Sequence, residues 1–382
     1  MKVPENGTEF LRWLQKVTGK EKQSFSAFSD FLEDKARAQG VPLHGQFELT
    51  PLCNFDCRMC YVHLNGEQMD VPLLSADEWK HLMHEAWSCG MISATLTGGE
   101  CLTYPGFEEL YLYLHSLGCE VKIISNGSLL DEHWIRFFKE HPPAQIQITL
   151  YGSSEDAYQM VTGKRCFETV LYNLYQIKNA DLPLRINITP SRYQADDILN
   201  TYKAARSITD AVRINSCLFS PREETGRDEQ WDDLDADGYI DLFRTIKEFN
   251  GEEIIEISAD RLPPAGGVGS SEKSQRTGLK CGGGRSSFVI DWKGNMNPCN
   301  RLPMIEGHPL KDGFPAAWKK INQEANLWPA VPECEECVYK SVCINCAANM
   351  MRYARPGVRP VLLCEETKRY VQKGIGNIPD CE

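Results

Sequence analysis

Three cysteines stand close together in the stretch "LTPLCNFDCRMCYV", residues 49–62. Cys53, Cys57 and Cys60 are one ligand short of a closed four-coordinate metal site. Either a fourth protein ligand comes from elsewhere, or the metal keeps one position open for another molecule. Zinc would take His63 as its fourth ligand, since this residue follows Cys60 by three positions. The residues alone leave both alternatives open.

A second, larger group of cysteines lies towards the carboxyl terminus. The whole chain holds 16 cysteines in 382 residues, and seven of them fall between 281 and 364. Four of these seven form the run "CEECVYKSVCINC", a C-x2-C-x5-C-x2-C pattern. We expect a cytoplasmic protein with reduced thiols, so clustered cysteines are predicted to be metal ligands and not disulfides. The seven residues are Cys281, Cys299, Cys334, Cys337, Cys343, Cys346 and Cys364.

The overall composition excludes several classes of partner. Apolar residues make up 42% of the chain and charged residues 25%, which is typical of a globular protein with a core. The net charge is −12 and no basic run is present, so nucleic acid is not an expected partner. No segment approaches the roughly 20 apolar residues of a membrane span, and the start of the chain does not read as a signal peptide. We therefore expect no membrane partner and a cytoplasmic location.

Short β-rich runs alternate with amphipathic helical segments through the first half of the chain. This alternation predicts a parallel sheet with right-handed crossovers. Six units over about 170 residues predict an α/β fold, a partial (β/α)6 barrel of the TIM type. One helical segment opens with the capping box Ser75–Glu78 and carries an apolar stripe from Trp79 to Ala86. The predicted strands are 46–50, 93–99, 121–127, 146–152, 184–189 and 211–217.

Composition divides the chain into four parts. The predicted parts are a helical segment (1–45), the barrel (46–220), a bridging region with a linker (221–280) and a cysteine-rich domain (281–382). The bridging region is acidic and contains one more predicted strand, 253–258. The last part begins with a predicted hairpin in "SSFVIDWKGNMNPC", which turns at Lys293–Gly294. We expect metals more than an apolar core to hold this last part.

Distinctive short motifs follow the predicted strands. "TGGE" ends the second strand, "SNG" the third and "TLYG" the fourth. The carboxyl ends of parallel strands meet at one edge of a barrel, where the βα loops converge and active sites lie. The two glycines of "TGGE" are expected to let a ligand approach the backbone closely. We therefore expect a site at this edge, beside the first three cysteines.

The C-x3-C-x2-C spacing after a first strand resembles the signature of the radical S-adenosylmethionine (SAM) superfamily. The resemblance implies a [4Fe–4S] cluster held by Cys53, Cys57 and Cys60, with the open iron taken by the methionyl group of SAM. It also implies that Glu100 accepts a hydrogen bond from the methionine ammonium, and that polar groups of "SNG" and "TLYG" contact the cofactor. The implied SAM contacts are Gly98, Gly99, Glu100, Ser125, Asn126 and Thr149.

Two positions depart from the family pattern. Met59 stands where an aromatic residue commonly precedes the third cysteine, and Tyr61 follows it instead. Cys101 stands where a proline often follows the glutamate of "TGGE". A thiol there could contact substrate, but a small buried residue that fills the core is the favoured interpretation.

The spacing of the carboxyl-terminal cysteines resembles the SPASM extension of radical SAM enzymes, which carries two auxiliary [4Fe–4S] clusters. Three clusters per chain are therefore implied. One auxiliary cluster would be held by Cys334, Cys337, Cys343 and Cys364. The other would be held by Cys281, Cys299 and Cys346, with a fourth ligand from Cys381 or Cys217, or with an open iron that binds a substrate thiolate.

SPASM relatives modify peptides or proteins, so the resemblance implies a peptide maturase. Reductive cleavage of SAM would give a radical that abstracts a hydrogen from a ribosomally made peptide, and a thioether cross-link is favoured. The implied partners are a peptide with a leader and an electron donor of the flavodoxin or ferredoxin type. Forty-five residues ahead of the barrel are few for a leader-binding domain, so a separate leader-binding protein would be a further partner.

Two alternatives stay open at this point. Sulfatase-maturase-like oxidation of cysteine or serine to formylglycine is the first, and it ranks lower because those enzymes carry an aspartate base where this chain has Asn300. A metal-stabilised binding scaffold without catalysis is the second. The sequence assigns no residue to the catalytic step itself.

Overall fold

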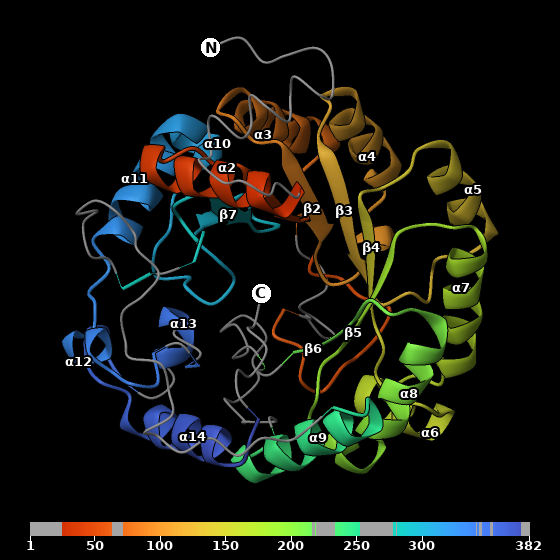
Figure 1. The fold of residues 1–382 in the computed structure, drawn as a ribbon. Helices are drawn as coiled ribbons and strands as arrows, with labels where there is room; N and C mark the ends of the chain where they lie inside the picture. The colour runs from red at the N-terminus through yellow and green to blue at the C-terminus, as the bar shows by residue number, and fades with distance from the viewer. Residues whose placement is uncertain are drawn as a thin grey trace, which may run out of the picture.

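The computed structural model describes residues 25–62, 72–215, 218, 234–252, 278–279, 281–340, 342–343, 346–351 and 354–375. Figure 1 shows strands in the interior of the molecule and helices around them. The described strands form one sheet in the order β6-β5-β4-β3-β2-β1-β7-β8. The predicted α/β fold with a partial parallel barrel is confirmed.

Six parallel strands, β1 to β6, follow the predicted order along the chain. The strands after which the motifs were placed end before their predicted limits, because the glycine-containing residues turn away into loops. The predicted strand 253–258 lies outside the described residues. The six strands are β1 (His44–Glu48), β2 (Ser93–Thr97), β3 (Glu120–Ser125), β4 (Gln145–Thr149), β5 (Leu184–Ile188) and β6 (Val212–Ile214).

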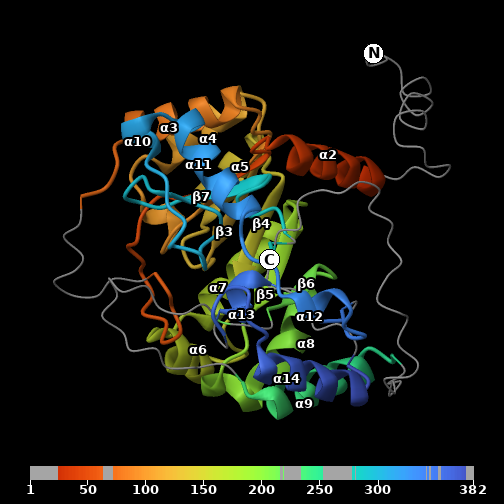
Figure 2. The same cartoon turned by 90° about the vertical axis from the view of Figure 1, so that its left-hand side faces the viewer.

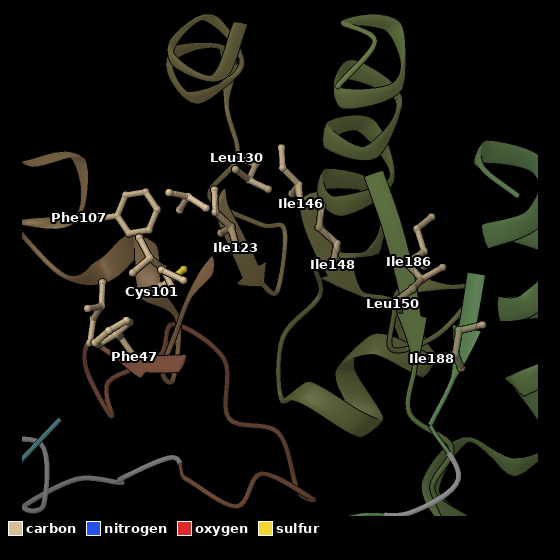
Figure 3. Packing of buried hydrophobic residues seen from close by; sticks show 14 of the residues in the cluster. Phe47, Cys101, Phe107, Ile123, Leu130, Ile146, Ile148, Leu150, Ile186 and Ile188 are labelled. Carbon is tan, nitrogen blue, oxygen red and sulfur yellow. The ribbon is translucent and has the colours of Figure 1, made fainter. Parts of the chain in front are cut away.

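Helices cover the outer face of these strands (Figure 1). Alternate strand residues such as Ile123, Ile148 and Ile186 point to this layer and are fully buried (Figure 3). Two 3₁₀ turns, η2 (Cys101–Thr103) and η3 (Arg192–Asp197), lie in the loops. The covering helices are α3 (Ala76–Ser88), α4 (Phe107–Ser116), α5 (Glu132–Glu140), α6 (Glu155–Thr162), α7 (Phe167–Asn179) and α8 (Ile198–Ile208).

Helix α3 shows how local sequence produces this layer. The Ser75 hydroxyl accepts from the Glu78 backbone, and the Glu78 carboxylate accepts from the Ser75 backbone, so the predicted capping box is present. The predicted stripe of Trp79, Leu82, Met83 and Ala86 is fully buried. One end of the helix is thus fixed by its own side chains and one face by the core.

The carboxyl-terminal part joins both edges of the six-stranded barrel. The predicted hairpin forms β7 (Ser287–Ile290) and β8 (Met296–Asn297), and β7 pairs in parallel with β1. Helix α11 (Phe314–Asn326) packs on α3, while α14 (Val361–Gln372) packs on α9 (Ala236–Phe249) beyond β6, as Figures 1 and 2 show. Shorter helices connect these pieces: α10 (Pro309–Asp312), α12 (Pro332–Glu335) and α13 (Ala347–Met350). In the described part of the chain, every helix is too short or too polar to cross a membrane.

Helix α2 (Phe25–Gln39) is tied to the start of the barrel through Glu33. The Glu33 carboxylate lies 2.9 Å from His44 Nε2 of β1 and also accepts from Ser286 beside β7. The hydrogen bond with His44 is the main cause that lowers the pKa of Glu33 to about 2, and the bond with Ser286 contributes further. Ionised Glu33 therefore stabilises the contact of α2 with two strands.

We predict a pH-dependent loss of stability for Glu33→Gln. The folded pKa lies below the ordinary value, so the stabilisation is complete above about pH 4.5 and is lost as pH falls towards 2. Wild type should exceed the variant by about 1–2 kcal/mol near pH 6, and the difference should shrink below pH 4. Urea unfolding followed by circular dichroism measures it. Glu132→Gln, at an exposed position of α5, should show no such difference, and a pH-independent difference for Glu33→Gln would contradict the prediction.

Candidate functional site

The loop that carries the first cysteine is held against the "TGGE" turn by two backbone hydrogen bonds. Gly99 N–H donates to Thr50 O at 2.7 Å, and Glu100 N–H donates to Leu52 O at 2.8 Å. A Cβ at Gly98 would lie 2.4 Å from Thr50 O, and one at Gly99 would lie 2.3 Å from Leu52 O. Only glycine allows this approach. The side-chain positions of both glycines are thus filled by the protein's own backbone, and a ligand contact at Gly98 and Gly99 stays a prediction.

Glu100 lies at the centre of the strand ends and is fully buried. Its carboxylate accepts from Asn126 N–H at 2.7 Å, from Ser125 Oγ at 3.0 Å and from Leu102 N–H at 3.2 Å. Burial raises the pKa of Glu100, because loss of water outweighs these hydrogen bonds. The structure therefore brings three of the predicted site residues into one buried network between β2 and β3.

Asn126 connects this network to the cysteine loop. Its Nδ2 donates to Asn54 Oδ1 at 2.8 Å and lies 3.7 Å from Cys53 Sγ. Asn54 Nδ2 in turn donates to Ser128 Oγ at 2.8 Å. Asn54 and Ser128 were missed in the sequence, although each directly follows a predicted site residue or motif. Short polar side chains at those positions are the signal that would have found them.

The three thiols of the first motif gather around one aromatic ring. The pKa of the Tyr151 phenol is raised, mainly by burial and then by the nearby charges of Cys57, Cys53 and Cys60. Cys53 Sγ also accepts from Phe55 N–H at 3.4 Å. Burial raises the pKa of the Cys53 thiol to about 12, so a thiolate there requires a bound cation.

The described thiols are not gathered as ligands of a single metal ion. Across the described ranges, no three histidine, cysteine or acidic side chains form such a group. A four-iron cluster binds each thiolate through a different iron, which suits a wider arrangement than zinc requires. The donor set consists of thiols with N–H groups directed at Cys53, which fits an iron–sulfur cluster. His63, the fourth ligand of the zinc alternative, lies outside the described residues.

Thr149 is the last residue of β4 and does not belong to the Glu100 network. It is half-buried and stands opposite Asn187 of β5. Beyond β5, Gln194 Nε2 donates to Thr189 O at 2.8 Å and Asn215 Nδ2 donates to Thr189 Oγ1 at 3.1 Å. These amide side chains were not singled out in the sequence. They form a second polar group at the carboxyl ends of β4 to β6.

Cys101 belongs to the core and not to the site surface. Its side chain is fully buried, and Sγ lies 3.3 Å from Ile124 O. Burial raises the pKa of this thiol well above its ordinary value, so it remains protonated. Both observations support the interpretation of Cys101 as a residue that fills the core.

Four carboxyl-terminal thiols line one cavity. Its volume is about 270 Å³, and the rest of its wall is largely apolar. Thr367 Oγ1 lies 3.6 Å from Cys343 Sγ, and interaction with Cys364 is the main cause that raises the pKa of Arg359. The four thiols come from the run 334–343 and from helix α14, and they are those assigned to one auxiliary cluster from the sequence: Cys334, Cys337, Cys343 and Cys364.

The remaining three thiols lie together at a different place, between the hairpin and α13. Burial is the main cause that raises the pKa of Cys299 to about 12, and the charges of Cys346 and Cys281 add to the rise. Cys299 and Cys346 pack with apolar residues such as Leu302. The two candidates for a fourth ligand, Cys217 and Cys381, lie outside the described residues.

A chain of hydrogen bonds joins the first cysteine loop to the hairpin loop. Asn300 Nδ2 donates to the Tyr61 hydroxyl at 2.8 Å, and that hydroxyl donates to Glu48 Oε1 at 3.1 Å. Tyr61 directly follows Cys60, Asn300 directly follows Cys299, and Glu48 is fully buried at the end of β1. The two clusters of cysteines are thus connected through residues next to Cys60 and Cys299. No sequence pattern pairs these three side chains, because they lie on segments far apart.

Comparison with known families decides what this arrangement is. The model of the radical SAM superfamily matches residues 47–205, which span the cysteine loop and β2 to β5. Residues 47–205 are therefore a radical SAM domain. This family implies an enzyme that uses SAM and a [4Fe–4S] cluster.

Similar proteins are consistent with this family match. An AdoMet-dependent heme synthase of Methanosarcina barkeri is 27% identical over 334 residues, which cover 81% of this chain and 92% of the synthase. The sporulation killing factor maturation protein SkfB of Bacillus subtilis is 25% identical over 291 residues, 75% of this chain and 68% of SkfB. The fold resembles that of Streptococcus suis SuiB bound to S-adenosylmethionine, with a TM-score of 0.66 and 13% identity over 94% of this chain and 87% of SuiB.

We predict that Gly99→Ala prevents this radical SAM enzyme from binding its first cluster. The new methyl group would collide with Leu52 O, so the loop bearing Cys53 must move. Iron per chain after anaerobic reconstitution should fall by about four, the content of one cluster. Gly118→Ala is the control, because a Cβ there would meet no atom within 4 Å, so any effect of its positive φ of 75° is separate from a collision with the cysteine loop. Unchanged iron in Gly99→Ala would contradict the prediction.

Proposed function

We propose that this radical SAM enzyme is a peptide maturase that installs a cross-link, with a thioether favoured, in a ribosomally made peptide. The observation that supports it is the placement of the carboxyl-terminal thiols. Four of them line one cavity, and three more lie together beside the hairpin loop. Two such sets of cysteines suit two auxiliary [4Fe–4S] clusters. With the SAM-binding cluster, the proposed enzyme holds three clusters in all. SkfB, a relative named for peptide maturation, supports the same assignment.

SAM and the iron–sulfur clusters would have one role in the reaction, and the protein residues another. When bound, SAM and its cluster supply hydrogen abstraction from the peptide, and auxiliary clusters accept the electron that the peptide loses. The chain itself fixes the cysteine loop through Gly98 and Gly99 and holds Asn126 beside Cys53. For SAM we assign contacts to Gly98, Gly99, Glu100, Ser125, Asn126 and Thr149. A flavodoxin or ferredoxin would deliver electrons, and a separate protein would bind the leader.

A thioether is favoured because the cysteines beside the hairpin provide only three thiol ligands in the described ranges. A cluster on Cys281, Cys299 and Cys346 would keep one iron open for a substrate thiolate. A peptide cysteine bound there would lie near the hydrogen bond from Asn300 to Tyr61 that links the two loops. Asn300 also argues against the sulfatase-maturase alternative, because an amide cannot accept the proton that an aspartate would.

A second candidate substrate is a tetrapyrrole. The heme synthase of M. barkeri aligns over 92% of its own length, whereas SkfB aligns over 68%. Because the match covers nearly the whole length of the synthase, this substrate class stays as the alternative to a peptide. The non-catalytic scaffold is set aside, because the superfamily consists of enzymes.

We predict that Cys381→Ser and Cys217→Ser each retain full iron. If the second auxiliary cluster has an open iron, neither residue is a ligand, and about 12 irons per chain remain. Cys364→Ser should lose about four irons, because Cys364 lines the four-thiol cavity. A loss of iron in Cys381→Ser or Cys217→Ser would show that the cluster is closed by that thiol.

The maturase assignment is tested by co-expression with a short cysteine-containing peptide encoded beside the gene, under anaerobic conditions with iron supplied. Peptide mass is measured before and after thiol alkylation. We expect the loss of two hydrogens together with one thiol that no longer alkylates. The same mass loss with every thiol free would replace the thioether by another cross-link, and an unchanged mass would contradict the assignment.

A further inference from the structure

The inner face of the barrel sheet is mostly polar. Ile123, Ile146, Ile148, Ile186 and Ile188 point to the helix-covered face (Figure 3), so the residues between them lie on the opposite, inner face, where Ile124 is the one apolar residue of β3. Parallel sheets buried on both faces are normally apolar throughout. A polar inner face therefore indicates contact with water or with a polar ligand. Its residues on β1 to β5 include Gln46, Thr95, Lys122, Gln145, Gln147, Thr149, Arg185 and Asn187.

Two cations stand on this face on either side of β4. Lys122 of β3 is opposite Gln145, and Arg185 of β5 is opposite Gln147. Their Cα atoms are therefore about 12 Å apart, since two strand spacings and two residues along the strands separate them. Both side chains are long enough to converge on one ligand from the two sides.

These groups have no partner within the described structure. Neither Lys122 nor Arg185 forms a side-chain hydrogen bond or ion pair there, although both are half-buried. Asn187, two residues beyond Arg185, is only 3% exposed, and its Oδ1 has no hydrogen-bond partner. A buried amide without a partner destabilises the fold unless a ligand or water completes it.

The charge of this face is opposite to that of the whole protein. The chain has 53 acidic and 41 basic residues, so acidic side chains outnumber basic ones overall. Two half-buried cations without a partner among the described residues therefore distinguish this face from the rest of the protein. Arg213 of β6 is opposite Asn187 on the same face, but it already has an interaction partner and is not part of the proposed anchor. Of the inner-face acids on these strands, Glu48 accepts from Tyr61, and Glu120 is exposed at the first residue of β3.

We propose that the inner face of β3 to β5 binds a carboxylate of the substrate through Lys122 and Arg185. This inference rests on the proposed function, because it takes the barrel interior as the place of the substrate. Lys122 precedes Ser125 by three residues, so the anchor lies about 10 Å below the Ser125–Asn126 site along the strand. An acidic group about three extended residues from the reacting carbon would reach it.

The carboxylate could come from an acidic peptide side chain or from a carboxylated tetrapyrrole. The test measures binding of two matched pairs to the anaerobically reconstituted enzyme: a fluorescent glutamate-containing peptide against its glutamine counterpart, and heme against heme dimethyl ester. We expect one acid form to bind at least about tenfold more tightly than its neutral form, and this preference to weaken at high salt. The pair that shows the preference identifies the source.

Lys122→Met and Arg185→Met should each remove most of the preference, while Arg185→Lys should retain part of it. Lys139→Met and Arg136→Gln, at exposed positions of α5 outside the barrel, are matched controls that should keep it. Iron content and thermal unfolding confirm that the variants fold. Equal binding of acid and neutral forms of both pairs, or a preference that survives both inner-face substitutions, would overturn the proposal.

The outcome is separable from that of the maturase assignment. Release of 5′-deoxyadenosine on reduction does not require the anchor, so it should continue in both variants. A preference seen only with heme would support the anchor and contradict a peptide substrate. Loss of the anchor with an intact peptide cross-link would overturn this inference alone.

Discussion

The rest of the site depends on one close backbone contact, between the "TGGE" turn and residues 50–52. Two hydrogen bonds of 2.7 and 2.8 Å join these segments, at a separation that no side chain larger than hydrogen permits. The contact brings the cysteine loop of β1 against the ends of β2 and β3. Buried Glu100 then fixes Ser125 and Asn126, and Asn126 reaches Cys53. The position of Cys53 therefore depends on this backbone contact and on the buried Glu100 network.

The carboxyl-terminal part is also attached to the barrel by contacts between segments far apart in the sequence. Its hairpin adds to the sheet beside β1, and α14 packs on α9 beyond β6. The segment that carries seven cysteines is therefore attached at both edges of the barrel. The hydrogen bonds from Asn300 to Tyr61 and from Tyr61 to Glu48 add a direct connection between the two thiol-bearing loops. Both loops are therefore held at a fixed position relative to each other, as electron transfer between them would require.

The sequence predicts those features that arise from local patterns. The strand order, the capping box and apolar stripe of α3, and the grouping of motifs at strand ends all follow from periodicity and turn residues. The partner of Gly99, the parallel pairing of β7 with β1 and the Tyr61–Asn300 link could not be predicted, because they join segments separated by tens to hundreds of residues. The inner-face cations lie between these cases. Alternation in "VKIIS" and "LRINI" places Lys122 and Arg185 on one face, but only the fold shows that the helices of the described residues lie on the other face.

The most direct test of the site records electron paramagnetic resonance spectra of the reduced, reconstituted protein with and without SAM. If Cys53, Cys57 and Cys60 hold the cluster that binds SAM, adding SAM changes the signal of one cluster and leaves the others as they are. Cys334→Ser should keep that change, and Cys57→Ser should abolish it. A wild-type spectrum that SAM does not alter, or a change that persists in Cys57→Ser, would contradict the assignment of this loop as the SAM site.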